Sequence, residues 1–247
     1  MKVAIITGAS RGIGRSAAIQ AAKKGIGVIV TFVTRRDEAD AVVHAIEAAG
    51  GKAAALELDV GAVGTFRAFR EQAVELLRRR WERDSFDYLV NNAGYGLFKP
   101  IEDVVEAEFD GLLNVHLKGP FFLTQTLLPL MASGGAIVNV TSATTRVATA
   151  GVAPYAAFKG GLEVLTRYMA KEFGARRIRV NAVSPGAIRT DLGGGLTPAL
   201  ETILAEQTAL GRVGEPDDVG KVIASLMSDE LGWVNAQSIE VAGGYLV

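Results

Sequence analysis

Tyr155 and Lys159 are the residues whose types and spacing most directly suggest chemistry. They precede an apolar run at helical spacing through Leu162, Leu165 and Met169. On a helix, residues four apart share a face, so the Lys159 ammonium can lie near the Tyr155 phenol. A neighbouring cation favours the phenolate and lowers a tyrosine pKa from its usual value of about 10, which suits acid–base catalysis. Taken alone, the spacing fits an exposed tyrosine beside a solvated lysine better, so the rest of the sequence has to decide.

The elements that must position this pair are repeated strand and helix segments. Short apolar, β-branched runs alternate with stretches whose apolar residues recur at helical spacing. About seven runs are strand candidates, namely Val3–Ile6, Val28–Phe32, Ala53–Leu58, Tyr88–Val90, Ala136–Val140, Arg179–Val183 and Ser238–Val241. Strands that are apolar on both faces and separated by helices predict a parallel sheet covered on both sides. The sequence therefore predicts a doubly wound α/β fold.

Polar and glycine-containing motifs follow five of these predicted strands. In a doubly wound sheet, ligands bind beyond the carboxyl ends of the strands, near the point where the strand order reverses. We therefore expect one edge of the sheet to collect the segments Thr7 to Gly14, Asp59, Asn91 to Gly94, Thr141–Ser142 and Pro185–Gly186.

The first of these motifs is a glycine-rich turn between a predicted strand and a predicted helix. Gly8, Gly12 and Gly14 stand at positions i, i+4 and i+6. Such glycines permit a tight turn and close backbone approach, and the following helix presents free amides to an anion. The motif predicts a dinucleotide pyrophosphate site; the alternative is a glycine turn without a ligand.

The end of the second predicted strand indicates which nicotinamide cofactor is used. An acidic residue there would bond the ribose 2′-hydroxyl of NAD, but Val33 and Thr34 occupy the position. Arg35 and Arg36 follow, and Arg11 is available from the glycine turn. Arginines suit a 2′-phosphate through charge-assisted hydrogen bonds, so we predict NADPH over NADH. The alternative is that the two consecutive arginines are solvated charges at a helix start.

Together these residues resemble the short-chain dehydrogenase/reductase family over almost the whole chain. The resemblance is carried by Thr7-Gly8-Ala9-Ser10-Arg11-Gly12-Ile13-Gly14, Asn91-Asn92-Ala93-Gly94, Asn114 in Leu113-Asn114-Val115, Ser142, Tyr155-x-x-x-Lys159 and Pro185–Gly186 with Thr190. It implies a single Rossmann-type domain over residues 1–247 that also carries the catalytic site, with a substrate loop at about 187–207.

The resemblance implies a role for each catalytic position. Tyr155 would exchange a proton with the carbonyl or alcohol oxygen, and Ser142 would orient that oxygen. Lys159 would bond the nicotinamide ribose and lower the Tyr155 pKa, and Asn114 would hold a water that links Lys159 to solvent. By the same resemblance, NADP(H) would contact Gly8, Ser10, Arg11, Gly12, Ile13, Gly14, Thr34, Arg35, Asp59, Val60, Asn91, Ala93, Gly94, Tyr155, Lys159, Pro185, Gly186, Ile188 and Thr190.

Composition narrows the classes of function. The chain has no cysteine, which excludes disulfides, thiolate metal sites and cysteine nucleophiles, and its two histidines are far apart, so we expect no metal. A net charge of −1 with mixed signs gives no basic field for nucleic acid. No apolar run is long enough for a membrane span and no signal peptide is evident, so we expect a cytoplasmic protein without a membrane partner.

The expected function is NADP(H)-dependent hydride transfer to a ketone or aldehyde, or from a secondary alcohol. Family members that reduce 3-oxoacyl thioesters on acyl carrier protein resemble the chain broadly, which makes such thioesters one candidate. Alternatives are an NAD(P)-dependent sugar or polyol dehydrogenase and a non-catalytic NADPH-binding sensor. Family resemblance also implies a homotetramer built through two long helices at about Glu106 to Met131 and Tyr155 to Phe173, together with contacts near the C-terminus.

Overall fold

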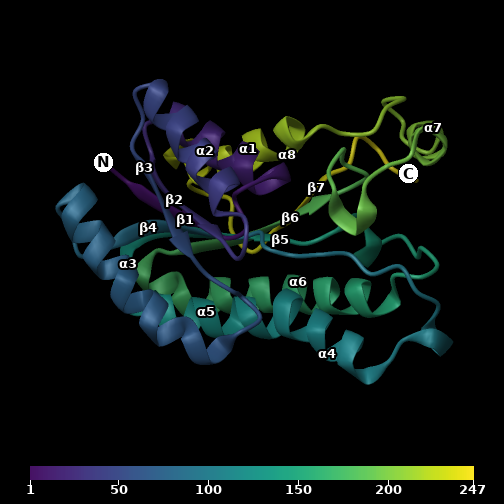
Figure 1. Ribbon diagram of the computed structural model, residues 1–247, viewed down its shortest axis with the longest axis horizontal. Coiled ribbons are helices and arrows are strands. Elements are labelled where there is room, and N and C mark those ends of the chain that lie inside the picture. Colours follow the sequence, from purple (N-terminus) through teal and green to yellow (C-terminus); the bar gives the residue numbers. More distant parts are fainter.

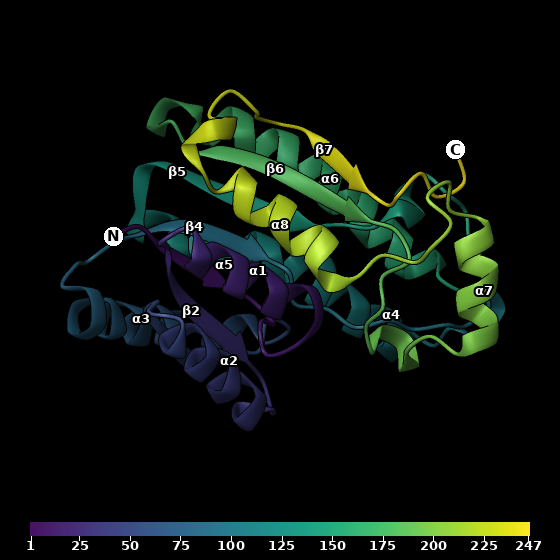
Figure 2. The same ribbon diagram turned by 90° about the horizontal axis from the view of Figure 1, so that it is seen from above.

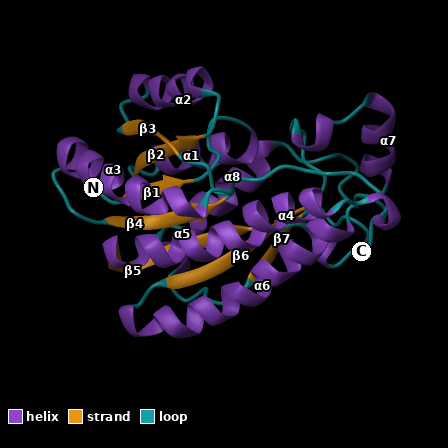
Figure 3. Cartoon of the chain, turned by 60° about the horizontal axis from the view of Figure 1, so that its bottom comes forward, coloured by secondary structure: helices purple, strands orange, loops and turns teal.

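The computed structural model describes residues 1–247, and its centre is a seven-stranded parallel sheet. The strands lie side by side in the order β3-β2-β1-β4-β5-β6-β7 (Figure 3). Their bounds are β1 Val3–Ile6, β2 Gly27–Phe32, β3 Ala53–Glu57, β4 Phe86–Asn91, β5 Met131–Val140, β6 Arg179–Pro185 and β7 Ser238–Val241. The predicted doubly wound α/β fold is confirmed, with a strand at each predicted position.

Helices cover both faces of this sheet (Figure 1). They are α1 Gly12–Lys23, α2 Arg36–Ala48, α3 Phe66–Trp81, α4 Glu106–Leu113, α5 Gly119–Leu127, α6 Ala153–Phe173, α7 Pro198–Glu206 and α8 Pro216–Leu226. One apolar cluster packs α1, α2 and α8 against one face, and a second packs α3, α5 and α6 against the other. Because both faces are covered, β1, β2 and β4 are buried at every position, which explains their continuous apolar runs.

The strand order reverses between β1 and β4, and this point is held together by side chains. The chain starts at β1, moves outward to β3 and returns to β4 on the other side of β1. The Thr7 hydroxyl accepts hydrogen bonds from the backbone amides of Asn92 and Ala93 at 2.9 and 3.0 Å. The side-chain amide nitrogen of Asn92, Nδ2, donates to the Thr7 and Gly8 carbonyls at 2.8 and 3.1 Å. The glycine turn is therefore fixed beside the end of β4.

The long helix expected from Glu106 to Met131 is not continuous. The chain forms α4, then a π-helical segment over Asn114–Lys118, then α5, and Met131 already belongs to β5. In the π-helical segment the Gly119 amide donates to the Asn114 carbonyl, five residues back. Pro129 lies just beyond α5, where a residue without an N–H does not continue a helix. The prediction was therefore wrong in the continuity and the C-terminal end of this helix.

Helix α7, the second-to-last α-helix, lies apart from the sheet, beside the C-terminus (Figure 2). None of its residues is buried, and the Leu246 amide donates to the Gln207 carbonyl just after the helix. No helix of the protein combines the length and the apolar character that a bilayer crossing requires.

Candidate active site

A cavity of about 870 Å³ lies at the carboxyl edge of the sheet and brings most of the predicted motifs together. The glycine turn after β1 and the end of β2 line one part of it. The segments after β4, β5 and β6, the start of α6 and the loop leading into α7 line the rest. Parallel strands carry their following loops to one edge, so motifs far apart in the sequence share one cavity.

Tyr155 and Lys159 enter this cavity from the first two turns of α6. The helix begins at Ala153 and has Pro154 in its first turn, a position where a missing N–H costs nothing. Lys159 is 4% exposed, and its ammonium donates to the Val140 carbonyl at the end of β5 over 2.7 Å. The Lys159 Nζ also lies 5.6 Å from the centroid of the Tyr155 ring. The pair therefore faces the end of β5.

Burial dominates the charge states of both side chains. It raises the pKa of Tyr155 to about 12, against a hydrogen bond from Ser142 that lowers it. It lowers the pKa of Lys159 to about 8. Burial is the largest influence on the Tyr155 pKa, and a lowering of this pKa by Lys159 stays a prediction. At neutral pH the phenol carries its proton.

Ser142 follows β5 and reaches the cavity beside Tyr155. Its backbone is extended, with φ of −163°, and its hydroxyl caps the short 3₁₀ turn Ala143–Thr145. The hydroxyl accepts hydrogen bonds from the Thr144 amide at 3.2 Å and from the Thr144 hydroxyl at 2.9 Å. Ser142 and Thr144 thus form a hydrogen-bonded pair at the cavity wall, which Tyr155 also lines.

His116 is a further cavity residue in contact with Tyr155. Its ring lies edge-on to the Tyr155 ring, with centroids 4.9 Å apart. Its Nε2 donates to the Tyr95 carbonyl over 2.8 Å, and its buried Nδ1 has no partner. Burial lowers the His116 pKa to about 3. The Lys159 charge lowers it further by a smaller amount, and the hydrogen bond to Tyr95 acts in the opposite direction. The imidazole is therefore neutral at physiological pH.

The glycine turn is shaped for close backbone approach. Gly8 and Gly12 have φ of +61° and +55°, in the region that disfavours side chains. A Cβ on Gly8 would lie 2.8 Å from Ala93 Cα, and one on Gly14 would lie 2.5 Å from the Asn92 side chain. Neither position has room for a larger residue, which is the cradle expected of a dinucleotide turn.

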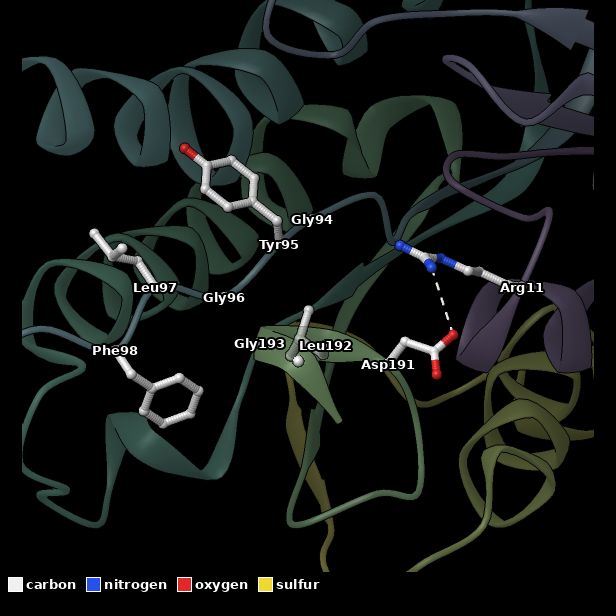
Figure 4. Close-up of a pocket in the computed structure, with 10 residues that line it drawn as sticks. Arg11, Gly94, Tyr95, Gly96, Leu97, Phe98, Asp191, Leu192 and Gly193 are labelled. Atoms are coloured by element: carbon white, nitrogen blue, oxygen red, sulfur yellow. Dashed lines mark hydrogen bonds and ion pairs between the residues drawn. The ribbon is translucent and has the colours of Figure 1, made fainter. Parts of the chain in front are cut away.

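Arginines surround the cofactor end of the cavity, each in an exposed ion pair. Arg11 and Arg35 line the cavity; Arg11 pairs with Asp191 at 3.4 Å, and Arg35 pairs with Glu38 on α2. Arg36 is outside the cavity lining and pairs with Asp40. Figure 4 shows the Arg11 side chain reaching across to Asp191, in the segment between β6 and α7. Exposed pairs of this kind are worth at most about 1 kcal/mol, so an anion can displace them.

The end of the cavity toward α7 is lined mainly by apolar side chains. They are Leu97 and Phe98 after β4, Val152 before α6, Leu192 and Leu196 in the loop before α7, Leu200 and Leu204 on α7, and Tyr245 near the C-terminus. The loop before α7 touches the segment after β4 closely, since a Cβ on Gly193 would lie 2.5 Å from the Phe98 ring. Arg189 also lines this end, but it is bonded to both Glu201 and Glu215.

The structure brings most, but not all, of the predicted site residues to the cavity. Those that line it are Gly8, Ser10, Arg11, Gly12, Ile13, Thr34, Arg35, Ala93, Gly94, Ser142, Tyr155, Lys159, Pro185, Gly186, Ile188 and Thr190. Those outside the lining are Gly14, Asp59, Val60, Asn91 and Asn114. Asn91 is 4% exposed and donates to Asn139 and Thr124 inside the protein. Asp59 accepts from the Gly61 amide in an exposed turn.

Several cavity residues were not predicted from the sequence. They include Asn92, His116, Thr144, Leu200, Leu204 and Tyr245. Asn92 stood inside a recognised motif, and Thr144 stood two residues after Ser142, so a polar residue near a strand end was the available signal. His116 gave no such signal, because it lies in a helical pattern that reads as structural. No group of three or more histidine, cysteine, aspartate or glutamate side chains is placed to hold a metal ion.

Comparisons with known proteins place this geometry in context. A family model described as enoyl-(acyl carrier protein) reductase matches residues 8–246. An uncharacterized oxidoreductase of Methylorubrum extorquens is 40% identical over 98% of this chain and 97% of its own. The 3-oxoacyl-(acyl-carrier-protein) reductase FabG of Staphylococcus epidermidis is 37% identical over 98% of both chains.

Among solved structures, the angucycline C-6 ketoreductase LanV with bound NADP is similar to this protein. It superposes with a TM-score of 0.94 at 36% identity, covering 99% of this chain and 95% of LanV. A second LanV structure contains NADP and rabelomycin and superposes with a TM-score of 0.92, covering 99% of this chain and 96% of LanV. The fold and the whole cavity region are included in these matches.

Proposed function

Because the chain belongs to the short-chain dehydrogenase/reductase family of oxidoreductases, we propose that it is an NADP(H)-dependent ketoreductase acting on a bulky apolar ketone. The observation that carries this proposal is the convergence of Ser142, Tyr155 and Lys159 on one cavity. The same cavity continues to the glycine turn and to the arginines beyond β2. A proton donor, an oxygen-orienting hydroxyl and a dinucleotide cradle are thereby held together.

Tyr155 serves as the proton donor. Burial keeps its phenol protonated at neutral pH, with a pKa of about 12, so it is in the form that ketone reduction requires. Ser142 lies beside it and donates a hydrogen bond to the carbonyl oxygen, where negative charge develops in the transition state. Lys159, with a pKa of about 8, is mostly protonated at neutral pH, and its ammonium lies 5.6 Å from the centroid of the Tyr155 ring.

The residues present fit NADP(H), which supplies the hydride when bound. The glycine turn leaves the first amides of α1 free for a pyrophosphate. No acidic residue stands at the end of β2, where one would bond a ribose 2′-hydroxyl. Arg11 and Arg35 line the cavity there and suit a 2′-phosphate. LanV, which was solved with NADP, supports the same assignment.

The apolar end of the cavity supports a bulky ketone as substrate. Its leucines and aromatic rings can bury apolar surface of a substrate, and the cavity that they line also contains Ser142 and Tyr155. Arg189 at this end of the cavity is already bonded to both Glu201 and Glu215, which disfavours its pairing with a charged substrate group. LanV, a ketoreductase of similar structure, was solved with bound rabelomycin, which supports a small-molecule ketone as the substrate class.

A 3-oxoacyl thioester is the second candidate substrate. The similarity to FabG over 98% of the chain favours it. The apolar residues that line the cavity near α7 favour a free ketone instead, because they can bury its apolar surface.

The test is NADPH oxidation, followed by the reduced-nicotinamide absorbance, against aryl and polycyclic ketones, aldehydes and 3-oxoacyl thioesters. We expect turnover of bulky ketones, a marked preference for NADPH over NADH, and a loss of about 10³-fold or more in kcat for Tyr155→Phe. Turnover that persists in Tyr155→Phe would contradict the assigned proton donor. Cofactor binding without turnover of any substrate, in either direction, would favour a non-catalytic NADPH-binding protein.

A further inference from the structure

Ser142 has a neighbour that fixes the direction of its proton, and we propose that this neighbour, Thr144, is a positioning residue for the reduction. Thr144 lines the cavity beside Ser142 and touches the reaction only through it. This role rests on the ketoreductase activity proposed above. It assigns a function to a hydroxyl that is absent from the family motifs recognised in the sequence.

The argument starts from the bonding capacity of the Ser142 hydroxyl. A serine hydroxyl has one proton to donate and two lone pairs that accept. One lone pair accepts from the Thr144 amide at 3.2 Å, and an amide can only donate. The other accepts from the Thr144 hydroxyl at 2.9 Å. With both lone pairs occupied by a single residue, the Ser142 proton has to be directed away from Thr144.

The surrounding backbone leaves the cavity as the direction for that proton. The Ser142 carbonyl accepts from the Thr145 amide at 3.1 Å and lies 3.0 Å from the Thr145 hydroxyl. The Glu163 carboxylate lies 3.1 Å from the Thr141 hydroxyl and 3.0 Å from that of Thr145, so it holds both sides of the turn. These contacts fix the backbone of the turn that carries Ser142. Its hydroxyl faces Tyr155, which lines the same cavity.

The consequence is a hydrogen-bond donor that is oriented before the substrate arrives. Preorganised donors stabilise developing charge without reorganising at the moment of reaction. Accepting a bond from the Thr144 hydroxyl also polarises the Ser142 hydroxyl and makes it a stronger donor. Without the Thr144 hydroxyl, the Ser142 proton can rotate toward the vacated side, and part of this advantage is lost.

The test compares Thr144→Val, which keeps the shape of the side chain but removes the hydroxyl, with Thr144→Ser, which keeps the hydroxyl. Loss of one neutral hydrogen bond predicts a fall in kcat of about tenfold in Thr144→Val. The KM for NADPH should not change, because the effect lies in the chemical step. Thr144→Ser should restore kcat to within about twofold of the wild type.

A second measurement reads the same hydrogen bond without turnover. Tyrosine labelled with ¹³C at Cζ gives one signal for Tyr155, which Tyr155→Phe identifies, and its chemical shift reports hydrogen bonding at the phenol oxygen. We expect this signal to move at neutral pH in Thr144→Val and to return in Thr144→Ser. This measurement tests whether Thr144 orients Ser142 even if no ketone is turned over. A lack of turnover would count against the ketoreductase proposal alone.

Two results would overturn the assignment. One is a Thr144→Val variant that matches the wild type in kcat and in the Tyr155 signal, because the hydroxyl would then have no effect on Ser142. The other is a Thr144→Ser variant as impaired as Thr144→Val, which would assign the loss to side-chain volume.

Discussion

Burial sets the charge of the three ionisable side chains around the reacting position. Tyr155 is held protonated, His116 is held neutral, and Lys159 has a pKa of about 8, so it loses its proton more readily than an exposed lysine. The three side chains contact one another through ring edges and a ring face. Their charges therefore affect stability as well as chemistry.

Lys159 should be costly to the stability of the cofactor-free protein. A pKa of about 8 in the folded chain, below the ordinary 10.5, means that folding disfavours the charged form. This shift corresponds to a stability penalty for the charged lysine. After the stabilisation by the hydrogen bond to Val140 is subtracted, the net penalty is about 2 kcal/mol at pH 7. We expect Lys159→Met to abolish turnover yet to raise the free energy of unfolding by that amount, measured by urea denaturation.

The pH dependence of this effect follows from the direction of the shift. Below pH 8 the folded and unfolded chains both carry the proton, and the penalty is complete. Between pH 8 and 10.5 the folded chain loses its proton first, and wild-type stability gains. The advantage of Lys159→Met should therefore shrink over that window; an advantage that is constant with pH would contradict a buried-charge origin.

His116 should make the protein sensitive to acid. Its pKa of about 3 in the folded chain lies below the ordinary 6.5, so the unfolded chain takes up a proton first as the pH falls. The contribution of neutral His116 to the free energy of unfolding is complete above pH 6.5 and is lost as the pH falls toward 3. The loss between pH 8 and pH 5 is about 2 kcal/mol.

Urea denaturation across that range provides the measurement for His116. We expect His116→Asn to flatten the pH slope, whatever its absolute stability. The matched control is His44→Asn, since His44 is exposed on α2 and has no such environment. Equal slopes in the wild type and His116→Asn would show that other groups cause the acid sensitivity.

At the scale of elements, the backbone is strained at Glu82, the residue that follows α3. Glu82 follows the helix with φ of 58°, and its amide closes the last turn by donating to Arg78. A residue with a Cβ is disfavoured in this conformation by about 1 kcal/mol relative to glycine. We expect Glu82→Gly to raise the free energy of unfolding by about 0.5–1 kcal/mol.

The control for this change is Glu82→Ala, which removes the same carboxylate but retains the Cβ. Thermal and urea denaturation should show stabilisation for glycine only. If both variants gained equally, removal of a negative charge from a helix C-terminus would be the cause.

The sheet could be predicted from the sequence, but the direction of its side chains could not. Apolar, β-branched runs bounded by glycines and polar motifs marked each strand. Because β4 is buried on both faces, however, its pattern does not show to which side Asn91 turns, and the structure turns it toward Asn139. In the same way, the spacing of Tyr155 and Lys159 fixed their shared face but not the Val140 carbonyl that binds the lysine.

The break between α4 and α5 could not be predicted from the sequence, for a different reason. A periodic apolar pattern continues through Asn114–Lys118, and the insertion of a π-helical turn changes the hydrogen bonding with little change in that pattern. The turn carries Gly119 against the Val60 carbonyl, where a Cβ would lie 2.2 Å from the oxygen. Such close tertiary packing decides the geometry, and sequence periodicity does not record it.

At the scale of the whole molecule, the outer faces of α5 and α6 expose apolar side chains. Phe121 lies on α5, and Val164 and Tyr168 lie one turn apart on α6, with Tyr168 64% exposed. Exposed apolar groups on neighbouring helices are typical of protein interfaces. They support the homotetramer expected from the family resemblance, built through the helices on this side of the sheet.

Light scattering tests the homotetramer directly. We expect a mass four times the 26.0 kDa of the monomer, falling to that of a smaller species in Tyr168→Glu. Trp233→Gln is a suitable control, because Trp233 is fully exposed on a different segment, before β7. A monomeric wild type would exclude the assembly, and an unchanged mass in Tyr168→Glu would place the interface elsewhere.

The ion pair between Arg11 and Asp191 has a consequence for enzyme engineering. It joins two loops 180 residues apart in the sequence, so the substrate loop competes with the cofactor phosphate for one guanidinium. Asp191→Asn should release Arg11 and lower the KM for NADPH by up to about fivefold, since an exposed pair is worth at most about 1 kcal/mol. The KM for NADH should not change, and equal effects on both cofactors would exclude this competition. Cofactor preference would then be adjustable from the substrate loop, without altering any residue of the dinucleotide fingerprint.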